Sequence, residues 1–354
     1  MKEYKMTKSS ETSPTYPYNE QEICFQNIPD NISLAGTLTI PKTDRKQLPA
    51  IVLIAGMGPH TRNYEMLGHK IFLVLADYLT RQGFAVLRFD KRGVGKSTGT
   101  FDLNATSKDL SSDVSAAIDY LKSRPEIDPH NIGLIGHSEG GMITTMIANK
   151  RNDLAFIVLL AGAIATESRN VLEHVAMQLK ADGACQEMIF QDRAIRKKLL
   201  EIIKKEPDRS RASIILQQTV NEYLNNLSDK LQEESTQYHF TINENNAHGV
   251  IQMLNSPWYR YILNVNPIDM LKEITIPTLA LYGSHDFVTA PRIIIPLITK
   301  ATRTTDNITV MEFPHLNHWL QPSKTGAMQE YGKSKETIAQ TVLKTISDWI
   351  KNII

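Results

Sequence analysis

The feature that most constrains this chain is a Gly-x-Ser-x-Gly motif made by Gly136, Ser138 and Gly140. It follows the apolar run 132–135 and precedes 142–148, a stretch that can form a helix. A strand, a sharp turn and a helix in this order are typical of a serine held on a strained turn at the edge of a sheet. Glycine on both sides lets the strand and the helix approach closely, because a Cβ there would collide. We therefore expect Ser138 to be a nucleophile, although a glycine-rich turn with an ordinary surface serine shares the pattern.

The composition narrows the class of protein further. The 354 residues carry a net charge of +1, and no basic tract is interleaved with aromatic residues, so a nucleic-acid partner is not expected. Cys24 and Cys185 lie far apart without partner spacing, so we expect neither a disulfide framework nor a metal site. No run of 18 apolar residues suggests a membrane span, and residues 1–8 lack an apolar signal core. The expectation is a cytoplasmic enzyme without a cofactor, whose oligomeric state stays open.

Strand and helix patterns alternate along most of the chain, which predicts an α/β fold with a mostly parallel, doubly wound sheet. Residues 1–19 are polar and are expected to form a flexible arm. The next two strands, separated by a turn at 29–31, are expected to form an antiparallel hairpin at the sheet edge. The predicted strands are 23–25, 34–40, 49–55, 84–89, 132–136, 155–160, 276–282 and 308–313, and the predicted helices of this part are 67–82, 106–124, 142–148 and 333–350.

The pattern changes between residues 164 and 256, where no convincing strand occurs. This region reads instead as helices, and the expected domain organisation is an α/β core of 20–163 and 257–354 with a helical cap of 164–256 inserted into it. A helical block placed between two strands of a sheet is best interpreted as a lid over the edge that carries Ser138. The predicted helices of the cap are 171–181, 184–205, 210–231 and 247–254.

The loop 90–97 superficially resembles a phosphate-binding loop. That motif needs a glycine five residues before Gly95, but Asp90 occupies the position, and no helix follows the strand directly. The alternative is a loop that shapes the edge of the sheet, with Asp90 and Arg92 pairing internally. We favour this alternative.

A serine hydroxyl needs a base to take its proton, and the base needs an acid that holds its tautomer. On this architecture the expected chain order is serine, acid, histidine, each after a strand. Asp286 follows the strand after the insertion and is the expected acid. Its alternative role is that of an aspartate that only caps a turn, and the neighbouring His285 could be mistaken for the base. His315 and His318 both follow the last strand; His318 lies deeper in the loop and is the favoured base.

An oxyanion requires two preorganised N–H donors. The expected donors are the amide of Glu139, directly after the nucleophile, and that of Met57, in the loop after strand 49–55. The carboxylate of Glu139 is more readily explained as an acid at a helix start than as a catalytic group. Trp258 and Tyr259 begin the return from the cap; they either line the substrate pocket or pack at the domain junction.

Several motifs resemble the EstD-type bacterial serine carboxylesterases of the α/β-hydrolase superfamily. They are Gly-His-Ser-Glu-Gly-Gly, Leu-Arg-Phe-Asp-Lys-Arg-Gly-Val-Gly-Lys-Ser, Ile-Ala-Gly-Met-Gly-Pro, the segment 159–163 and Ser-Pro-Trp-Tyr-Arg-Tyr at 256–261. The resemblance implies a carboxylesterase with Ser138, Asp286 and His318 as its triad and a helical cap over a short-acyl pocket. It also implies that the oxyanion hole is formed by the amides of Met57 and Glu139. Relatives often have a smaller residue in place of Met57, so this pocket could be narrower.

These observations favour a serine hydrolase that cleaves small carboxylic esters through an acyl-enzyme intermediate. A thioesterase, an amidase or a peptidase would use the same residues and differ only in the leaving group. A non-hydrolytic enzyme on the same fold, such as a lyase or a cofactor-free peroxidase, is a further alternative, because a fold does not determine its chemistry. A non-catalytic binding protein is the last alternative, and a complete triad in the expected order speaks against it.

Overall fold

A computed structural model describes residues 16–165, 168–303 and 306–354. Its centre is an eight-stranded sheet in the order β1-β2-β6-β3-β7-β8-β9-β10. The first two strands form the expected antiparallel hairpin at one edge, β2 pairs antiparallel with β6, and all remaining neighbours are parallel. The strands of this sheet are β1 (Tyr18–Asn27), β2 (Ile32–Pro41), β3 (Leu48–Ile54), β6 (Ala85–Phe89), β7 (Ile127–His137), β8 (Phe156–Leu160), β9 (Thr278–Gly283) and β10 (Ile308–Phe313).

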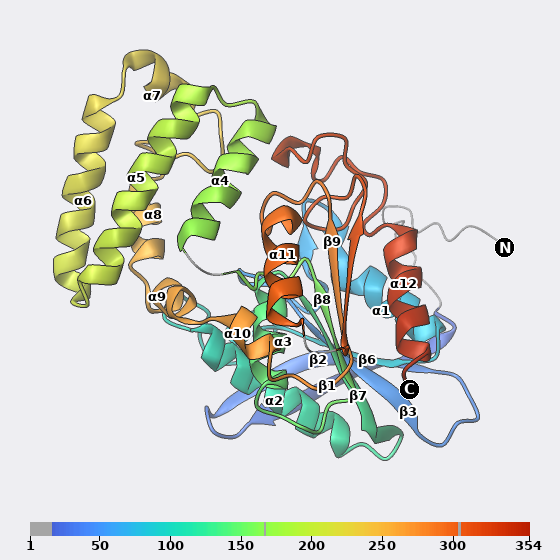
Figure 1. The fold of residues 1–354 in the computed structure, drawn as a ribbon. Coiled ribbons are helices and arrows are strands. Elements are labelled where there is room, and N and C mark those ends of the chain that lie inside the picture. The colour runs from blue at the N-terminus through green and yellow to red at the C-terminus, as the bar shows by residue number, and fades with distance from the viewer. Residues whose placement is uncertain (1–15, 166–167, 304–305) are drawn as a thin grey trace.

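Helices cover both faces of the sheet, as Figure 1 shows. One face is covered by α1 (Ile71–Arg81) and α12 (Gln340–Lys351). The other face is covered by α2 (Ser107–Lys122), α3 (Glu139–Ala148), α10 (Pro267–Leu271) and α11 (Pro291–Ala301). The prediction of a mostly parallel, doubly wound α/β sheet is therefore confirmed.

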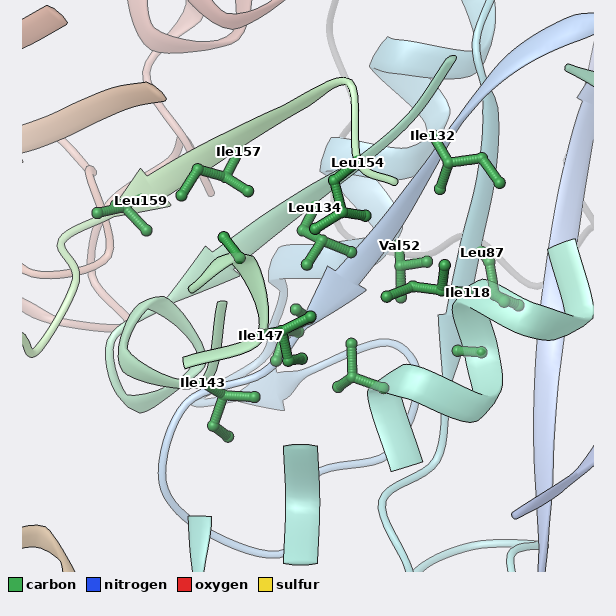
Figure 2. Packing of buried hydrophobic residues seen from close by; sticks show 14 of the residues in the cluster. Val52, Leu87, Ile118, Ile132, Leu134, Ile143, Ile147, Leu154, Ile157 and Leu159 are labelled. Atoms are coloured by element: carbon green, nitrogen blue, oxygen red, sulfur yellow. The ribbon is translucent and has the colours of Figure 1, made fainter. Parts of the chain in front are cut away.

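The central strands are buried on both faces, which explains why they are apolar without alternation. In β3 the side chains of Ala50, Val52 and Ile54 pack under α2 and α3, while Ile51 and Leu53 pack under α1 and α12. Figure 2 shows part of the hydrophobic cluster on the face of the sheet under α2 and α3. Its labelled residues are Val52, Leu87, Ile118, Ile132, Leu134, Ile143, Ile147, Leu154, Ile157 and Leu159. Tight packing between α3 and the sheet fixes the start of that helix, which is the point where Ser138 lies.

Between β8 and β9 the chain forms a group of helices that stands to one side of the sheet (Figure 1). They are α4 (Ser168–Asp182), α5 (Gln186–Lys205), α6 (Arg209–Asn226), α7 (Asp229–Ser235), α8 (Ala247–Leu254) and α9 (Pro257–Asn264). The group has hydrophobic clusters of its own, one between α5, α6 and α8 and another between α4, α5 and α7. Tyr259 and Leu263 of α9 pack against the cluster between α5, α6 and α8, so the helical group extends past residue 256.

Several predicted boundaries were wrong. The first helix begins at Ile71 rather than 67, because Leu67 and Gly68 have positive φ angles and join two short strands, β4 (Glu65–Met66) and β5 (His69–Lys70). The predicted helix 210–231 is two helices, since Leu227 is extended and Ser228 caps α7. The closing helix begins at 340 instead of 333, after the short helix η1 (Met328–Glu330).

Of the predicted N-terminal arm, residues 1–15 lie outside the described part of the chain. Its last two residues, 18 and 19, already belong to β1, where the Tyr18 hydroxyl donates to Asp77 at 2.9 Å. Within the described residues, no helix combines the length and the apolar character needed to cross a membrane.

Candidate active site

Ser138 occupies the sharp turn between β7 and α3, with a φ of 55° and a ψ of −120°. A positive φ is costly for a residue with a Cβ and persists only where the surroundings enforce it. Here they do: the Ser138 amide donates to the Leu160 carbonyl at 3.0 Å, and the amides of Gly141 and Ala163 both donate to the Ser138 carbonyl at 2.9 Å. The side chain of Ser138 is partly exposed at the carboxyl edge of the parallel strands.

The two glycines of the motif are required by close approach rather than by their φ angles. A Cβ on Gly136 would overlap the carbonyl oxygen of Gly140, and a Cβ on Gly140 would overlap the carbonyl oxygen of Ile54. The strand β7, the helix α3 and the neighbouring strand β3 meet at this point, so the strained turn is held by the core itself.

The side chains of Asp286 and His318 lie side by side in loops that follow β9 and β10. Asp286 Oδ2 is 2.9 Å from His318 Nδ1, and both residues are buried. The other contacts of the carboxylate come from Thr289, whose hydroxyl and amide both donate to it, and from the Val288 amide. Burial raises the pKa of Asp286, but His318 and the Thr289 hydrogen bonds outweigh that effect and hold the pKa below its usual value.

An ionised carboxylate only accepts hydrogen bonds, so Nδ1 of His318 carries the proton that is shared with Asp286. In the neutral imidazole this leaves Nε2 as the unprotonated nitrogen, which is the tautomer that a general base needs.

The backbone of His318 is held on both sides. Its amide donates to the Tyr331 hydroxyl at 3.1 Å, and its carbonyl accepts from His137 Nε2 at 2.9 Å. Because Nε2 of His137 donates, its Nδ1 accepts from the Tyr64 hydroxyl, 3.0 Å away. Burial, together with the neighbouring His318, lowers the pKa of His137 to about 3, so this ring is neutral. His137 directly precedes Ser138, and these contacts therefore bring the loop of His318 to the sharp turn at Ser138, called the elbow below.

The two residues expected to supply amides lie on either side of the elbow. Glu139 is the first residue of α3, and Met57, which is 55% exposed, lies in the loop after β3. The Met57 carbonyl accepts from His60 Nε2 at 2.5 Å. Neither the Met57 amide nor the Glu139 amide has an acceptor among the described residues.

The carboxylate of Glu139 is buried and is bound within the fold. Its Oε1 accepts from Ser107 Oγ and from Trp258 Nε1, both at 2.7 Å, and its Oε2 lies 4.0 Å from Lys91 Nζ. Trp258 thus packs at the junction between the return helix α9 and α3, one of the two expected roles. Tyr259 packs instead against the hydrophobic cluster of α5, α6 and α8.

Three other histidines lie near this edge of the sheet. His315 is exposed, and its ring stacks edge-on to that of His285, with 5.0 Å between centroids. His285 Nδ1 bonds the Ser323 carbonyl at 3.0 Å, so neither of the two contacts Asp286. His174 of α4 interacts electrostatically with Asp286 and His318, and its buried Nε2 has no hydrogen-bond partner among the described residues. Burial lowers the pKa of His174 to about 4.

The loop 90–97 is a centre of internal ion pairs. Asp90 pairs with Arg62 at 2.8 Å and accepts from the Lys96 amide at 3.1 Å. Arg92 pairs with Asp113 and with Asp30, both at 2.7 Å. A Cβ on Gly95 would press against the Asp90 carboxyl group. These contacts describe a loop that shapes the sheet edge, but Asp90 and Arg92 form their ion pairs with residues outside the loop and not with each other.

Sequence reasoning did not find the residues that hold the candidate site in place. Four side chains bond to residues of the site that lie between 3 and 73 positions away in the sequence: Tyr64, Lys91, Thr289 and Tyr331. Only the Thr289 contact is local, and a hydroxyl three residues after an aspartate in a turn is a signal that could have been used. The others depend on the tertiary fold.

Comparisons with known proteins agree with this architecture. The family described as serine aminopeptidase, S33, matches residues 45–214. Over 350 residues the chain is 24% identical to the esterase EstD of Thermotoga maritima, covering 97% of this chain and 71% of EstD.

Solved structures share the fold at low sequence identity. Est1E of Butyrivibrio proteoclasticus, solved with ferulic acid bound, matches with a TM-score of 0.54 and 17% identity, over 94% of this chain and 98% of Est1E. The hypothetical protein PA2218 of Pseudomonas aeruginosa matches with a TM-score of 0.58 and 17% identity, over 99% of this chain and 100% of the other.

Proposed function

We propose, from the premise that this chain belongs to the α/β-hydrolase superfamily, that it is a serine carboxylesterase acting on small, short-acyl esters. The observation that carries the proposal is the buried pair of Asp286 and His318, 2.9 Å apart, beside the strained turn of Ser138. A hydroxyl, an imidazole and a carboxylate in this arrangement are the parts of an activated nucleophile.

In the acylation step, Ser138 Oγ attacks the carbonyl carbon of the ester while Nε2 of His318 takes the hydroxyl proton. The positive charge that develops on the imidazole is stabilised by the ionised Asp286, which also holds the ring in orientation. Collapse of the tetrahedral intermediate breaks the bond to the alcohol oxygen, and His318 returns its proton to that leaving group.

In the deacylation step, water attacks the acyl-Ser138 ester while His318 accepts its proton. Collapse of the second intermediate then breaks the bond to Ser138 Oγ, which takes the proton back from His318. Both tetrahedral intermediates place a negative charge on the substrate oxygen. The amides of Met57 and Glu139 stabilise this charge, the latter with help from the N-terminal end of α3. The products are a carboxylic acid and an alcohol.

The helices α4 to α9, inserted between β8 and β9, act as a lid over this edge, with residues 20–163 and the chain that follows α9 as the core. Contacts of α4 support this role: Asp182 accepts from the Met328 amide at 2.9 Å, and Gln178 donates to the Gly326 carbonyl at 3.4 Å. Both partners follow His318 closely in the chain. A change in the position of α4 would therefore act on the loop that carries the base.

A second candidate is amide hydrolysis by the same residues, favoured by the description of the matching family as serine aminopeptidase. Amides have a poorer leaving group, so protonation by His318 would matter more. The relative rates of ester and amide hydrolysis separate the two candidates.

The test is hydrolysis of p-nitrophenyl esters from acetate to decanoate, and of aminoacyl p-nitroanilides, by the wild type and by Ser138→Ala. The proposal expects wild-type activity that is highest on short esters and that falls by at least about 1,000-fold in Ser138→Ala. Faster anilide than ester hydrolysis would favour the second candidate. A folded wild type that is silent on every substrate, or an active Ser138→Ala, would contradict both.

A further inference from the structure

Lys91 is a buried cation whose contacts are unlike those of its neighbours. Arg62 and Arg92 pair with carboxylates at 2.8 Å and 2.7 Å, whereas the charged partner of Lys91, Glu139, is 4.0 Å away. The closest contact of its ammonium is a neutral group: Nζ donates to the carbonyl of Gly56. The Phe101 ring lies 5.4 Å from Nζ. Burying a charge is expensive, and a neutral carbonyl compensates for it less well than a close carboxylate does.

The Gly56 carbonyl belongs to the peptide unit whose N–H is the amide of Met57. A peptide unit is planar and delocalised, so a cation bound to its oxygen draws electron density away from the nitrogen. The N–H at the other end becomes a stronger donor. His60 donates to the next carbonyl, that of Met57, so both peptide units around this amide are fixed in direction.

The counter-ion of Lys91 connects the same cation to the second amide. Glu139 supplies that amide, and its carboxylate is held by Ser107 and Trp258 as well as facing Lys91. The buried pair of Lys91 and Glu139 is thus connected to both expected oxyanion donors, the amides of Met57 and Glu139.

We propose that Lys91 is a positioning residue for the oxyanion hole: bound to the Gly56 carbonyl, it orients and polarises the Met57 amide toward the substrate oxygen. The inference rests on the proposed function, because it requires an oxyanion to form at Ser138. The neutral ester gains little from a stronger donor, whereas the charged intermediate gains much. The effect therefore lies in kcat and not in KM.

A merely structural role for Lys91 predicts lower stability with unchanged kinetics of the folded enzyme. Two variants separate these roles. Lys91→Met removes the cation at similar length but leaves the Glu139 carboxylate buried without it. Lys91→Met/Glu139→Gln removes both charges and leaves no uncompensated one, so it carries the test if the single variant does not fold. Arg92→Met is the matched control, since it removes a buried cation from the same loop.

The experiment measures kcat and KM for a p-nitrophenyl ester, and the inhibition constant of a trifluoromethyl ketone that forms a tetrahedral adduct with a serine. For both Lys91 variants we expect kcat to fall on the order of ten-fold, KM to stay within about two-fold, and the ketone to bind weaker by the same factor as kcat. The folded fraction of Arg92→Met should keep the wild-type kcat.

Wild-type kcat in the double variant, or an equal loss in Arg92→Met, would overturn the inference. Labelling of wild-type Ser138 by a fluorophosphonate distinguishes failure of the inference on Lys91 from failure of the proposed function. If Ser138 is labelled and the Lys91 variants are unchanged, the role of Lys91 alone is wrong. If Ser138 is not labelled and the wild type is inactive, the proposed function fails and the role of Lys91 with it.

Discussion

His318 Nδ1 lies 2.9 Å from Asp286 Oδ2, and neither side chain has more than a small fraction of its surface exposed to solvent. A buried carboxylate of lowered pKa in this position forces the neutral imidazole to present Nε2 without a proton.

Replacing Asp286 by Asn keeps the size of the side chain but allows its amide to donate to Nδ1, which places the imidazole proton on Nε2. The base then cannot accept the Ser138 proton. We expect kcat for a p-nitrophenyl ester at pH 7 to fall on the order of 1,000-fold to 10,000-fold. Asp269→Asn, at an exposed aspartate of α10, should leave kcat unchanged. Equal effects of the two variants would refute the role of Asp286.

His318 and His315 form a matched pair, since both lie in the loop after β10 but only His318 contacts Asp286. His318→Ala removes the base, and we expect kcat to fall by at least about 1,000-fold. His315→Ala should change kcat less than about three-fold, because surface substitutions of this kind rarely disturb a buried site. Steady-state ester kinetics on the two variants decide the assignment, and the reverse ranking would make His315 the base.

The close approach at the elbow predicts a position-specific cost in stability. Gly140→Ala places a Cβ against the Ile54 carbonyl, so we expect a loss of roughly 3 kcal/mol or more in the free energy of unfolding. Gly249→Ala lies in α8 with open space around its Cβ and should gain up to about 1 kcal/mol. Urea denaturation of both variants measures the difference. Similar stabilities would mean that α3 and β3 do not meet as described.

Three histidines of lowered pKa predict that the folded state is sensitive to acid. Burial is the largest cause that lowers the pKa of His60 to about 4, of His137 to about 3 and of His174 to about 4. The unfolded chain, with a histidine pKa near 6.5, binds protons between pH 6.5 and 4 that the folded state does not. Stability is therefore complete above about pH 6.5 and falls as the pH decreases, by roughly 2 kcal/mol for each histidine at pH 5.

Urea denaturation at pH 7.5, 6 and 5 checks this expectation. His174→Phe removes one of the three titrations together with a buried nitrogen that has no partner among the described residues. Its stability should depend on pH less steeply than that of the wild type, by about one third over this interval. A wild type of equal stability at pH 7.5 and pH 5 would show that these histidines titrate alike in the folded and unfolded states.

The sequence was sufficient where local pattern and chemistry point to the same answer. The strand Ile308–Phe313 was predicted to the residue, because a short segment rich in β-branched and aromatic residues between turn signals has few alternatives. The placement of Ser138 on a strained turn follows from the two glycines that flank it. The positions of Asp286 and His318, in loops that follow β9 and β10, could be predicted from the alternation of strands and loops on a parallel sheet.

What could not be predicted depends on tertiary contacts. A helix from 67 was reasonable on spacing alone, but Leu67 adopts a positive φ within a small hairpin. The contact of Trp258 with Glu139 joins residues 119 positions apart, and no local signal marks it. The same holds for Lys91, which is buried and donates to the Gly56 carbonyl, a contact between residues 35 positions apart.

The central claim is that Ser138 is the nucleophile of a serine hydrolase, and fluorophosphonate labelling followed by peptide mass spectrometry tests it most directly. We predict one covalent adduct for each molecule, located on Ser138, absent from Ser138→Ala and strongly reduced in His318→Ala. Formation of the adduct should abolish ester hydrolysis in proportion. A folded protein that hydrolyses esters while Ser138 stays unlabelled, or that carries the adduct on another residue, would contradict the account.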